Sequence, residues 1–140
     1  MWLSRIMETH TAENKKNKNM EDCIFCKIAG KKIDAKIVYE DKDVIAFNDT
    51  HPLAPIHVLV IPKKHIASIN DIEEKDRLLM GKMVFAARNI AQDLGAAEGG
   101  YKLLLRVGKN GGQEVDHIHL HLIGGAALHE DIHPLKVDWK

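Results

Sequence analysis

Short apolar segments, several with alternating apolar and polar residues, recur along the chain and predict β-strands. They are rich in β-branched residues and cover residues 36–40, 44–47, 57–61, 101–107 and 117–123. Residues that favour turns separate them: a charged run at 41–43, a loop with two prolines at 49–56, and a glycine-rich run at 108–112. We therefore expect five strands, most of them joined by hairpin-like turns.

One long segment, residues 72–94, repeats its apolar residues every three or four positions and predicts an amphipathic helix. Asp71 is the expected N-cap, because Glu74 follows three residues later in capping-box spacing. Gly95 is the expected C-cap, since glycine readily adopts the left-handed conformation that ends many helices.

The order of these elements predicts an α+β domain, with an antiparallel sheet of about five strands, one long helix on a face of the sheet, and a short helix near residues 23–28. Met83 and Phe85 of the long helix are expected to pack in the core. Residues 1–20 are rich in Lys, Asn and Glu and have no apolar period, so we expect a disordered tail. A single domain at residues 21–140 follows.

Composition and charge narrow the classes of function. The 20 basic and 20 acidic residues cancel, so nothing favours a broad electrostatic grip on nucleic acid or on an anionic membrane. No apolar run approaches the roughly 20 residues that a membrane-spanning helix needs. We expect a soluble cytoplasmic protein that binds neither nucleic acid nor membrane, in which a local cluster can still hold a small anion.

Nine histidines are the unusual feature of the composition, and three of them alternate at His117, His119 and His121. Because alternate residues of a strand share a face, the three imidazoles would point the same way, about 6.5–7 Å apart. Three interpretations follow: a solvent-facing strand that happens to be histidine-rich, a catalytic zinc site with an open coordination position, or a site where the central imidazole attacks phosphorus.

The neighbouring residues favour attack at phosphorus. Gly111, Gly112 and Gln113 come just before the strand, and glycines let backbone N–H groups approach a phosphate closely. Glu114 and Asp116 are near in sequence but do not complete a metal triad on the histidine face. With an unperturbed pKa of about 6.5, an imidazole is available near neutral pH as a neutral nucleophile.

Cys23 and Cys26 are too few and too close to form a disulfide framework. Their Cys-x-x-Cys spacing indicates metal or redox chemistry instead.

At this point the chain resembles the histidine triad (HIT) superfamily, and within it the nucleotide-binding Hint branch. The signature His-x-His-x-His followed by apolar residues stands at 117–123, with Gly112–Val115 before it and Gly124–Gly125 after it. Residues 54–66 and 23–28 are similar to the Hint branch as well. The resemblance covers roughly residues 21–125 and implies a homodimer, while the tail from about residue 126 diverges.

The resemblance implies hydrolysis of nucleoside 5'-phosphoramidates or acyl-nucleotides, usually purine ones of the AMP or GMP type. His119 would attack the α-phosphate to form a nucleotidyl-histidine that water resolves, so the chemistry would need no cofactor. His121 would contact phosphate oxygens or the leaving group, and His117 would orient its neighbour through hydrogen bonding. His57 would support the cluster, and Gln113 would steer the leaving group and the water.

The resemblance also implies a nucleotide pocket. Asp49 matches the position that accepts ribose hydroxyls, which suits a carboxylate with two acceptor oxygens. The apolar slot for the base matches Ile24, Phe25, Ile28, Phe47 and Leu59, for each of which plain core packing is an equally good interpretation. The phosphate side includes Gly112, Gln113, His119, His121 and Arg106.

Two residues depart from the family pattern. Arg106 stands where relatives usually have Asn near the phosphate, and Asp116 stands where they usually have an aromatic residue. This cation and this anion could pair with each other, or they could change the preferred leaving group.

In many bacterial relatives the cysteine pair binds zinc with two histidines, and the matching set here is Cys23, Cys26, His65 and His117. Four protein ligands leave no coordination position for water, so such a zinc would be structural. The alternative is a pair of buried, inert thiols. Two other functions stay open for the whole protein: a zinc-dependent hydrolase with the triad as ligands, and a nucleotide-binding adaptor with little catalysis.

Overall fold

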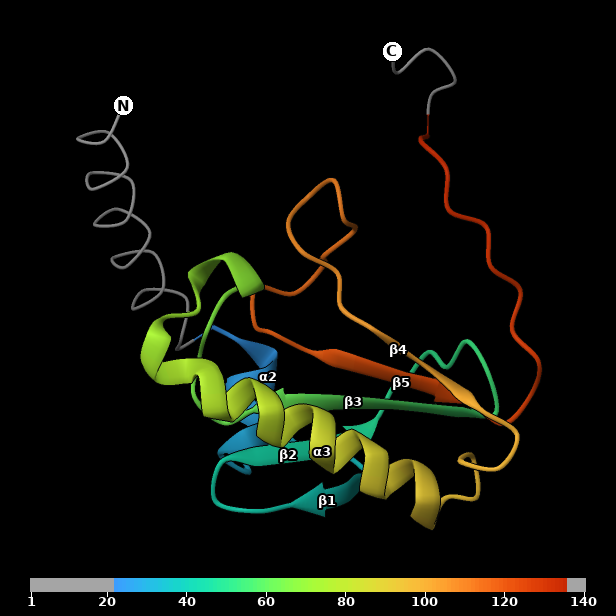
Figure 1. Ribbon diagram of the computed structural model, residues 1–140. Coiled ribbons are helices and arrows are strands. Elements are labelled where there is room, and N and C mark those ends of the chain that lie inside the picture. Colours follow the sequence, from blue (N-terminus) through green and yellow to red (C-terminus); the bar gives the residue numbers. More distant parts are fainter. Residues whose placement is uncertain (1–21, 136–140) are drawn as a thin grey trace.

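The computed structural model describes residues 22–135, which form an α+β fold around a single sheet (Figure 1). The sheet has five strands in the order β1-β2-β3-β5-β4, and every neighbouring pair is antiparallel. The strands are β1 (Ile37–Glu40), β2 (Val44–Asn48), β3 (Ile56–Pro62), β4 (Tyr101–Leu104) and β5 (Leu120–Gly124). The predicted fold class is confirmed, whereas the expected disordered tail lies outside the described residues.

Two helices cover opposite faces of the sheet, which is why its central strands are apolar on both sides. The long helix α3 (Arg77–Asp93) packs on the side chains of Val44, Ala46, Val58, Val60, Leu120 and Leu122. The short helix α2 (Ile24–Ala29) packs on the alternate residues Ile45, Phe47, Leu59 and Ile61. In the antiparallel register His121 lies opposite Leu59, so the histidines of β3 and β5 share the face of α2.

The long helix begins later than predicted. Residues 69–76 form two 3₁₀ turns, η1 (Ile69–Asp71) and η2 (Glu74–Asp76), before α3 starts at Arg77. The capping box joins Glu73 and Asp76 instead of the residues expected, because the buried Asp76 carboxylate also accepts from Lys64 Nζ at 2.6 Å. That ion pair ties the turn to the chain that follows β3, and the helix starts beyond it.

The other end of the helix and its buried face agree better with the prediction. The C-cap is Leu94, one residue before the predicted Gly95, and Gly95 follows it in the left-handed region with φ of +78°. Met83 is buried as expected, but Phe85 is 61% exposed and the expectation of core packing was wrong for it. Successive residues of an α-helix are rotated by about 100°, so Phe85 lies about 200° around the helix from Met83. Phe85 therefore points away from the sheet.

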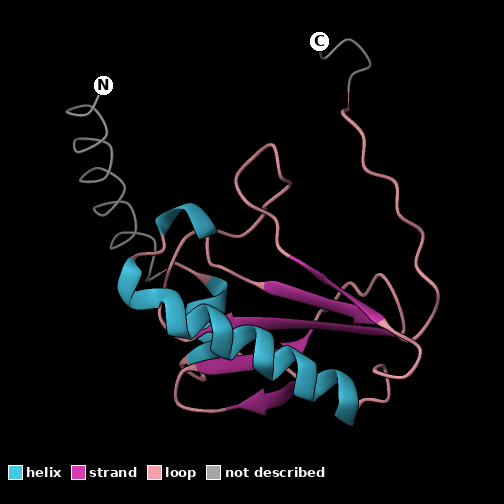
Figure 2. Cartoon of the chain, in the orientation of Figure 1, coloured by secondary structure: helices cyan, strands magenta, loops and turns pink. Residues whose placement is uncertain are grey.

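Strands β4 and β5 are shorter than predicted, and the loops around them are correspondingly longer (Figure 2). β5 begins at Leu120, so His117 and His119 lie in the segment that leads into it. The N–H of Ile118 in this segment donates to the carbonyl of Ile66 at 2.8 Å, which anchors it beside the chain that follows β3. Within residues 22–135, no helix is long and apolar enough to cross a membrane.

Candidate active site

His119 lies just before β5, and one backbone group determines which of its nitrogens is free. Its Nδ1 is 2.7 Å from the carbonyl oxygen of His117. A carbonyl only accepts, so Nδ1 carries the proton and Nε2 keeps its lone pair. Phe25 meets the ring edge-on, with 5.1 Å between the centroids. Burial lowers the pKa of His119 below its ordinary value, which favours a neutral imidazole with a nucleophilic Nε2.

A second chain of hydrogen bonds determines the tautomers of His57 and His121. The backbone N–H of Leu53 donates to His57 Nδ1 at 3.0 Å, so the proton of a neutral His57 sits on Nε2. This Nε2–H lies 2.9 Å from His121 Nδ1, which must accept it. The proton of a neutral His121 is therefore on Nε2, so His121 presents a donor where His119 presents a lone pair.

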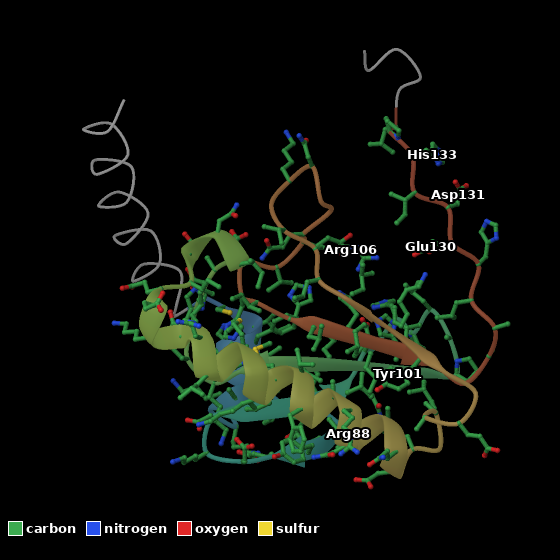
Figure 3. The ribbon with its side chains drawn as sticks, viewed as in Figure 1. Arg88, Tyr101, Arg106, Glu130, Asp131 and His133 are labelled. Atoms are coloured by element: carbon green, nitrogen blue, oxygen red, sulfur yellow. The ribbon has the colours of Figure 1, made fainter. Side chains whose placement is uncertain are left out.

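Arg106 brings a permanent positive charge to these histidines. It lies beyond the end of β4 and its Nη1 is 3.1 Å from His121 Nε2 (Figure 3). Burial, with the nearby His119 and Arg106, lowers the pKa of His121 to about 4. Burial and Arg106 also lower the pKa of His57, against the opposing effect of Asp49. The net effect keeps both imidazoles neutral at neutral pH.

Asp49 borders the cluster at the end of β2. Its Oδ1 accepts from the backbone N–H of His51 at 2.8 Å, and its Oδ2 lies 3.4 Å from His57 Nε2. The side chain keeps 20% of its surface exposed, so the carboxylate can still accept hydrogen bonds from a ligand's hydroxyl groups.

Gln113 is held by the backbone on both sides of its amide. Its Oε1 accepts from the N–H of Gly108 at 2.9 Å, and its Nε2 donates to the carbonyls of Ala67 and Val115 at 2.7 and 2.9 Å. These bonds fasten the glycine-rich loop to the chain that follows β3. In this arrangement the side chain positions the loop, a role that its place beside the triad did not reveal.

The residues expected to line a slot for the base are mostly buried. Phe25, Ile28, Phe47 and Leu59 are each at most 7% exposed and pack together in the cluster beneath α2. Of the expected set, Ile24 keeps the largest exposed fraction, 47%. Arg106 and Asp116, the two departures from the family pattern, do not form an ion pair among the described residues, and Asp116 is exposed.

The Cys-x-x-Cys pair meets His65 and His117 in a separate cluster. Cys23 Sγ, Cys26 Sγ and the two Nδ1 atoms all lie within 4.8 Å of one another. His117 Nε2 is 2.8 Å from the carbonyl of Pro62 and must donate to it, so its Nδ1 turns a lone pair toward the other three. The ring of His117 therefore belongs to the Cys/His cluster, and its backbone carbonyl is the group that contacts His119 Nδ1.

The spacing of this cluster fits a tetrahedral metal. His117 Nδ1 is 3.4 and 3.6 Å from the two Sγ atoms and 3.2 Å from His65 Nδ1. Zinc bonds of about 2.0–2.3 Å at tetrahedral angles separate such ligand atoms by roughly 3.3–3.8 Å. Burial and the neighbouring Cys23 raise the pKa of Cys26 to about 12, so its thiolate needs a cation. These residues could hold one zinc ion with no coordination position left open.

The five-stranded fold and the His-x-His-x-His motif at 117–121 are those of a histidine triad protein, and comparison with known families agrees. Residues 22–131 match the family model described as "Scavenger mRNA decapping enzyme C-term binding". Protein HitA of Neisseria gonorrhoeae is 46% identical over 75% of this chain and 97% of its own length. The purine nucleoside phosphoramidase of Escherichia coli K12 is 44% identical over 77% of this chain and 91% of its own length. The chain belongs to the histidine triad family.

Solved structures agree with this assignment. A HIT family hydrolase from Legionella pneumophila superposes with a TM-score of 0.75 at 50% identity, over 76% of this chain and 96% of that one. A zinc-bound histidine triad protein from Mycobacterium smegmatis superposes with a TM-score of 0.64 at 31% identity, over 73% of each chain. These relatives support a hydrolase, and one of them is a zinc-bound protein.

Proposed function

We propose that the protein hydrolyses purine nucleoside 5'-phosphoramidates or acyl-nucleotides through a nucleotidyl-His119 intermediate. The observation that carries the proposal is the pair of opposite tautomers, a lone pair on His119 Nε2 beside a proton on His121 Nε2. Covalent catalysis at phosphorus needs both, a nucleophile and a donor for the phosphoryl oxygens. The similarity to a purine nucleoside phosphoramidase supports this substrate class.

The reaction would proceed in two displacements. In the first, the lone pair of His119 Nε2 forms a bond to phosphorus, the bond to the leaving nitrogen breaks, and the amine departs with the electron pair and takes a proton from solvent. In the second, water attacks phosphorus, the bond to Nε2 breaks, and the nucleotide leaves as the water's proton passes to solvent. The hydrogen bond from Nδ1 to the His117 carbonyl stabilises the positive charge on the ring between the two steps.

The remaining residues would bind the nucleotide. Asp49 would accept the ribose hydroxyls, and the apolar cluster with Ile24 at its exposed side would face the base. Arg106, His121 and the backbone at Gly112 would surround the phosphate. His57 would act through His121 by supplying the hydrogen bond that keeps the donor proton on its Nε2.

A catalytic zinc held by the triad is the less favoured function. Of the triad, His121 belongs to a possible open metal site, in which its ligand atom and those of Asp49 and His57 lie within 4.8 Å of one another. However, Leu53 already donates to His57 Nδ1, so a metal at His57 Nε2 would need an imidazole with no proton on either nitrogen. An adaptor that binds nucleotide without turnover remains the other alternative, and AMP binding with no hydrolysis of any phosphoramidate would favour it.

The pH dependence of AMP release from adenosine 5'-phosphoramidate tests the function. The rate needs neutral His119, whose pKa is lowered from 6.5 by burial, so kcat/KM should stay constant as the pH falls from 8 through 6.5 and decline only toward the lowered pKa. Initial rates across pH 4.5–8 in buffers of constant ionic strength measure this. An acidic limb centred above pH 7, or no AMP release at any pH, would contradict the proposal.

We also propose that the protein is a homodimer joined through α3 and β4. Strand β4 is an edge of the sheet with unpaired backbone groups on one side, and α3 exposes Leu78, Val84 and Phe85 to 79, 49 and 61%. The guanidinium of Arg88, an α3 residue labelled in Figure 3, lies 5.7 Å from the centroid of the exposed Phe85 ring.

Phe85→Glu is expected to weaken such a dimer by at least about 30-fold in Kd, because burying an aromatic anchor at an interface typically contributes about 2 kcal/mol or more. Sedimentation equilibrium over a concentration series measures the Kd. The matched control is Val38→Glu, which adds the same charge at an exposed apolar position on β1, the opposite edge of the sheet. A monomeric wild type, or equal effects of the two variants, would refute this interface.

A further inference from the structure

Arg106 and His121 face each other as two donors with no acceptor between them. Leu53 donates to His57 Nδ1, so His57 must donate from Nε2 to His121 Nδ1, and the His121 proton is left on Nε2. Arg106 Nη1 lies 3.1 Å from that same Nε2, and a guanidinium has no lone pair to offer. The opposite tautomer of His121 would require His57 to lose both ring protons. The contact is therefore not a hydrogen bond, and it needs a third group that accepts from both.

Arg106 also has no carboxylate partner among the described residues. The ion pairs within residues 22–135 leave it out, although it is only partly exposed. The acidic group of the histidine cluster, Asp49, lies 3.4 Å from His57 Nε2 and forms no ion pair with Arg106. When a guanidinium is half-buried without a counter-ion, the cost of removing its charge from water is poorly compensated. An anion that binds beside it therefore gains a charge-assisted hydrogen bond.

The loop beside Arg106 holds its side chain in place. A Cβ at Gly112 would lie 3.4 Å from Arg106 Cδ, an ordinary van der Waals distance, so the loop packs directly beside the arginine stem. Gly112 has φ of +80°, a conformation that favours glycine in any case. Gln113 fastens this loop to Ala67 and Val115, so the donor is oriented before any ligand binds.

The Cys/His cluster shows the opposite chemistry about the same strand. There, His117 Nδ1 turns a lone pair toward two sulfur atoms and a second imidazole, and convergent acceptors call for a cation. At Arg106 and His121 the convergent groups are donors, and they call for an anion. The difference comes from the backbone. The Pro62 carbonyl takes the proton of His117 and leaves Nδ1 with a lone pair, whereas the Leu53 N–H acts through His57 and leaves His121 Nε2 with a proton.

We propose that Arg106 and His121 Nε2–H grip the same non-bridging oxygen of the substrate's phosphoryl group, which makes Arg106 the residue that selects for negative charge at that oxygen. The inference rests on the proposed function and deepens it. The substrate class is then the phosphoramidate or acyl-phosphate with two unsubstituted non-bridging oxygens. Negative charge grows on these oxygens as His119 attacks, so the grip strengthens in the transition state.

The test uses the Rp and Sp diastereomers of adenosine 5'-phosphorothioamidate, in which sulfur replaces one non-bridging oxygen or the other. Sulfur accepts hydrogen bonds poorly, so the wild type should hydrolyse one diastereomer much more slowly than the other. Arg106→Met, which keeps the length of the stem but has no donor, should lower kcat/KM for the all-oxygen substrate by about 10²–10³-fold, the usual loss for one such donor, and should shrink the preference to a few-fold. Arg106→Lys should recover part of the rate and part of the diastereomer preference, because lysine restores the positive charge but not the planar guanidinium with its several donors.

The matched control is Arg77→Met, which removes an exposed arginine at the start of α3 and should leave the hydrolysis of both diastereomers unaffected. Calorimetric titration with AMP separates this inference from the proposed function. AMP binding weakened at least about 10-fold in Arg106→Met supports the grip even if no phosphoramidate is hydrolysed, an outcome that would overturn only the function. Equal AMP affinity in the folded variant, or an unchanged diastereomer preference, overturns the grip.

Discussion

Replacing His119 with alanine is expected to lower the rate of AMP release by at least about 10⁴-fold, because the variant lacks the atom that attacks phosphorus. The loss should appear in kcat, while AMP affinity should change far less, since His121 and Arg106 remain to hold the phosphate. The fold should persist, because the ring makes one hydrogen bond, to a carbonyl that water can satisfy. Steady-state kinetics and circular dichroism measure the two effects.

A trapping experiment makes the same prediction in a second way. Wild-type protein mixed with labelled adenosine 5'-phosphoramidate and quenched in denaturant should carry an acid-labile nucleotidyl group, and His119→Ala should carry none. His133→Ala, which removes an exposed imidazole paired with Asp131, is the matched control and should react like the wild type. Retention of most activity by His119→Ala would exclude the covalent histidine mechanism.

Loss of the metal cluster should lower stability more than any surface change. We expect the purified protein to carry about one zinc per chain and Cys26→Ser to carry almost none, because a neutral hydroxyl replaces a thiolate ligand. The cluster joins α2 to β3 and to the segment before β5, so removing the metal should lower Tm by more than about 10 °C. Elemental analysis and thermal unfolding measure zinc content and Tm.

Chelation distinguishes a structural zinc from a catalytic one. Below the lowered Tm, chelator-treated wild type should keep most of its turnover, because none of the reacting groups is a zinc ligand in the proposed mechanism. The chelator should leave the Tm of Cys26→Ser unchanged, which controls for nonspecific effects. Turnover that disappears on chelation while the fold persists would show that a metal takes part in the chemistry. A zinc-free wild type with the same Tm as the zinc-bound protein would refute the stabilising role of the Cys/His cluster.

Local sequence determined the framework of the fold. The apolar runs at 44–47 and 57–61 and the helical period up to Asp93 sufficed for the α+β class, because strand and helix periods depend on near neighbours. The start of α3 was misplaced because Asp76 is buried against Lys64, a contact across twelve residues that no capping pattern contains. The expectation for Phe85 was wrong because its apolar side chain was given more weight than its position, two residues after Met83 and so on the other side of the helix.

The same division holds in the site. The alternation drew attention to His117, His119 and His121, and the Cys-x-x-Cys spacing indicated a metal or redox site, since alternation and spacing are local properties. Alternation alone treats the three histidines alike. The contacts that distinguish His117 from His121 come from the tertiary structure, because the carbonyl of Pro62 and the N–H of Leu53 belong to other parts of the chain. A proton's position on an imidazole depends on the partner that the fold brings to it, and that partner decides between ligand, nucleophile and donor.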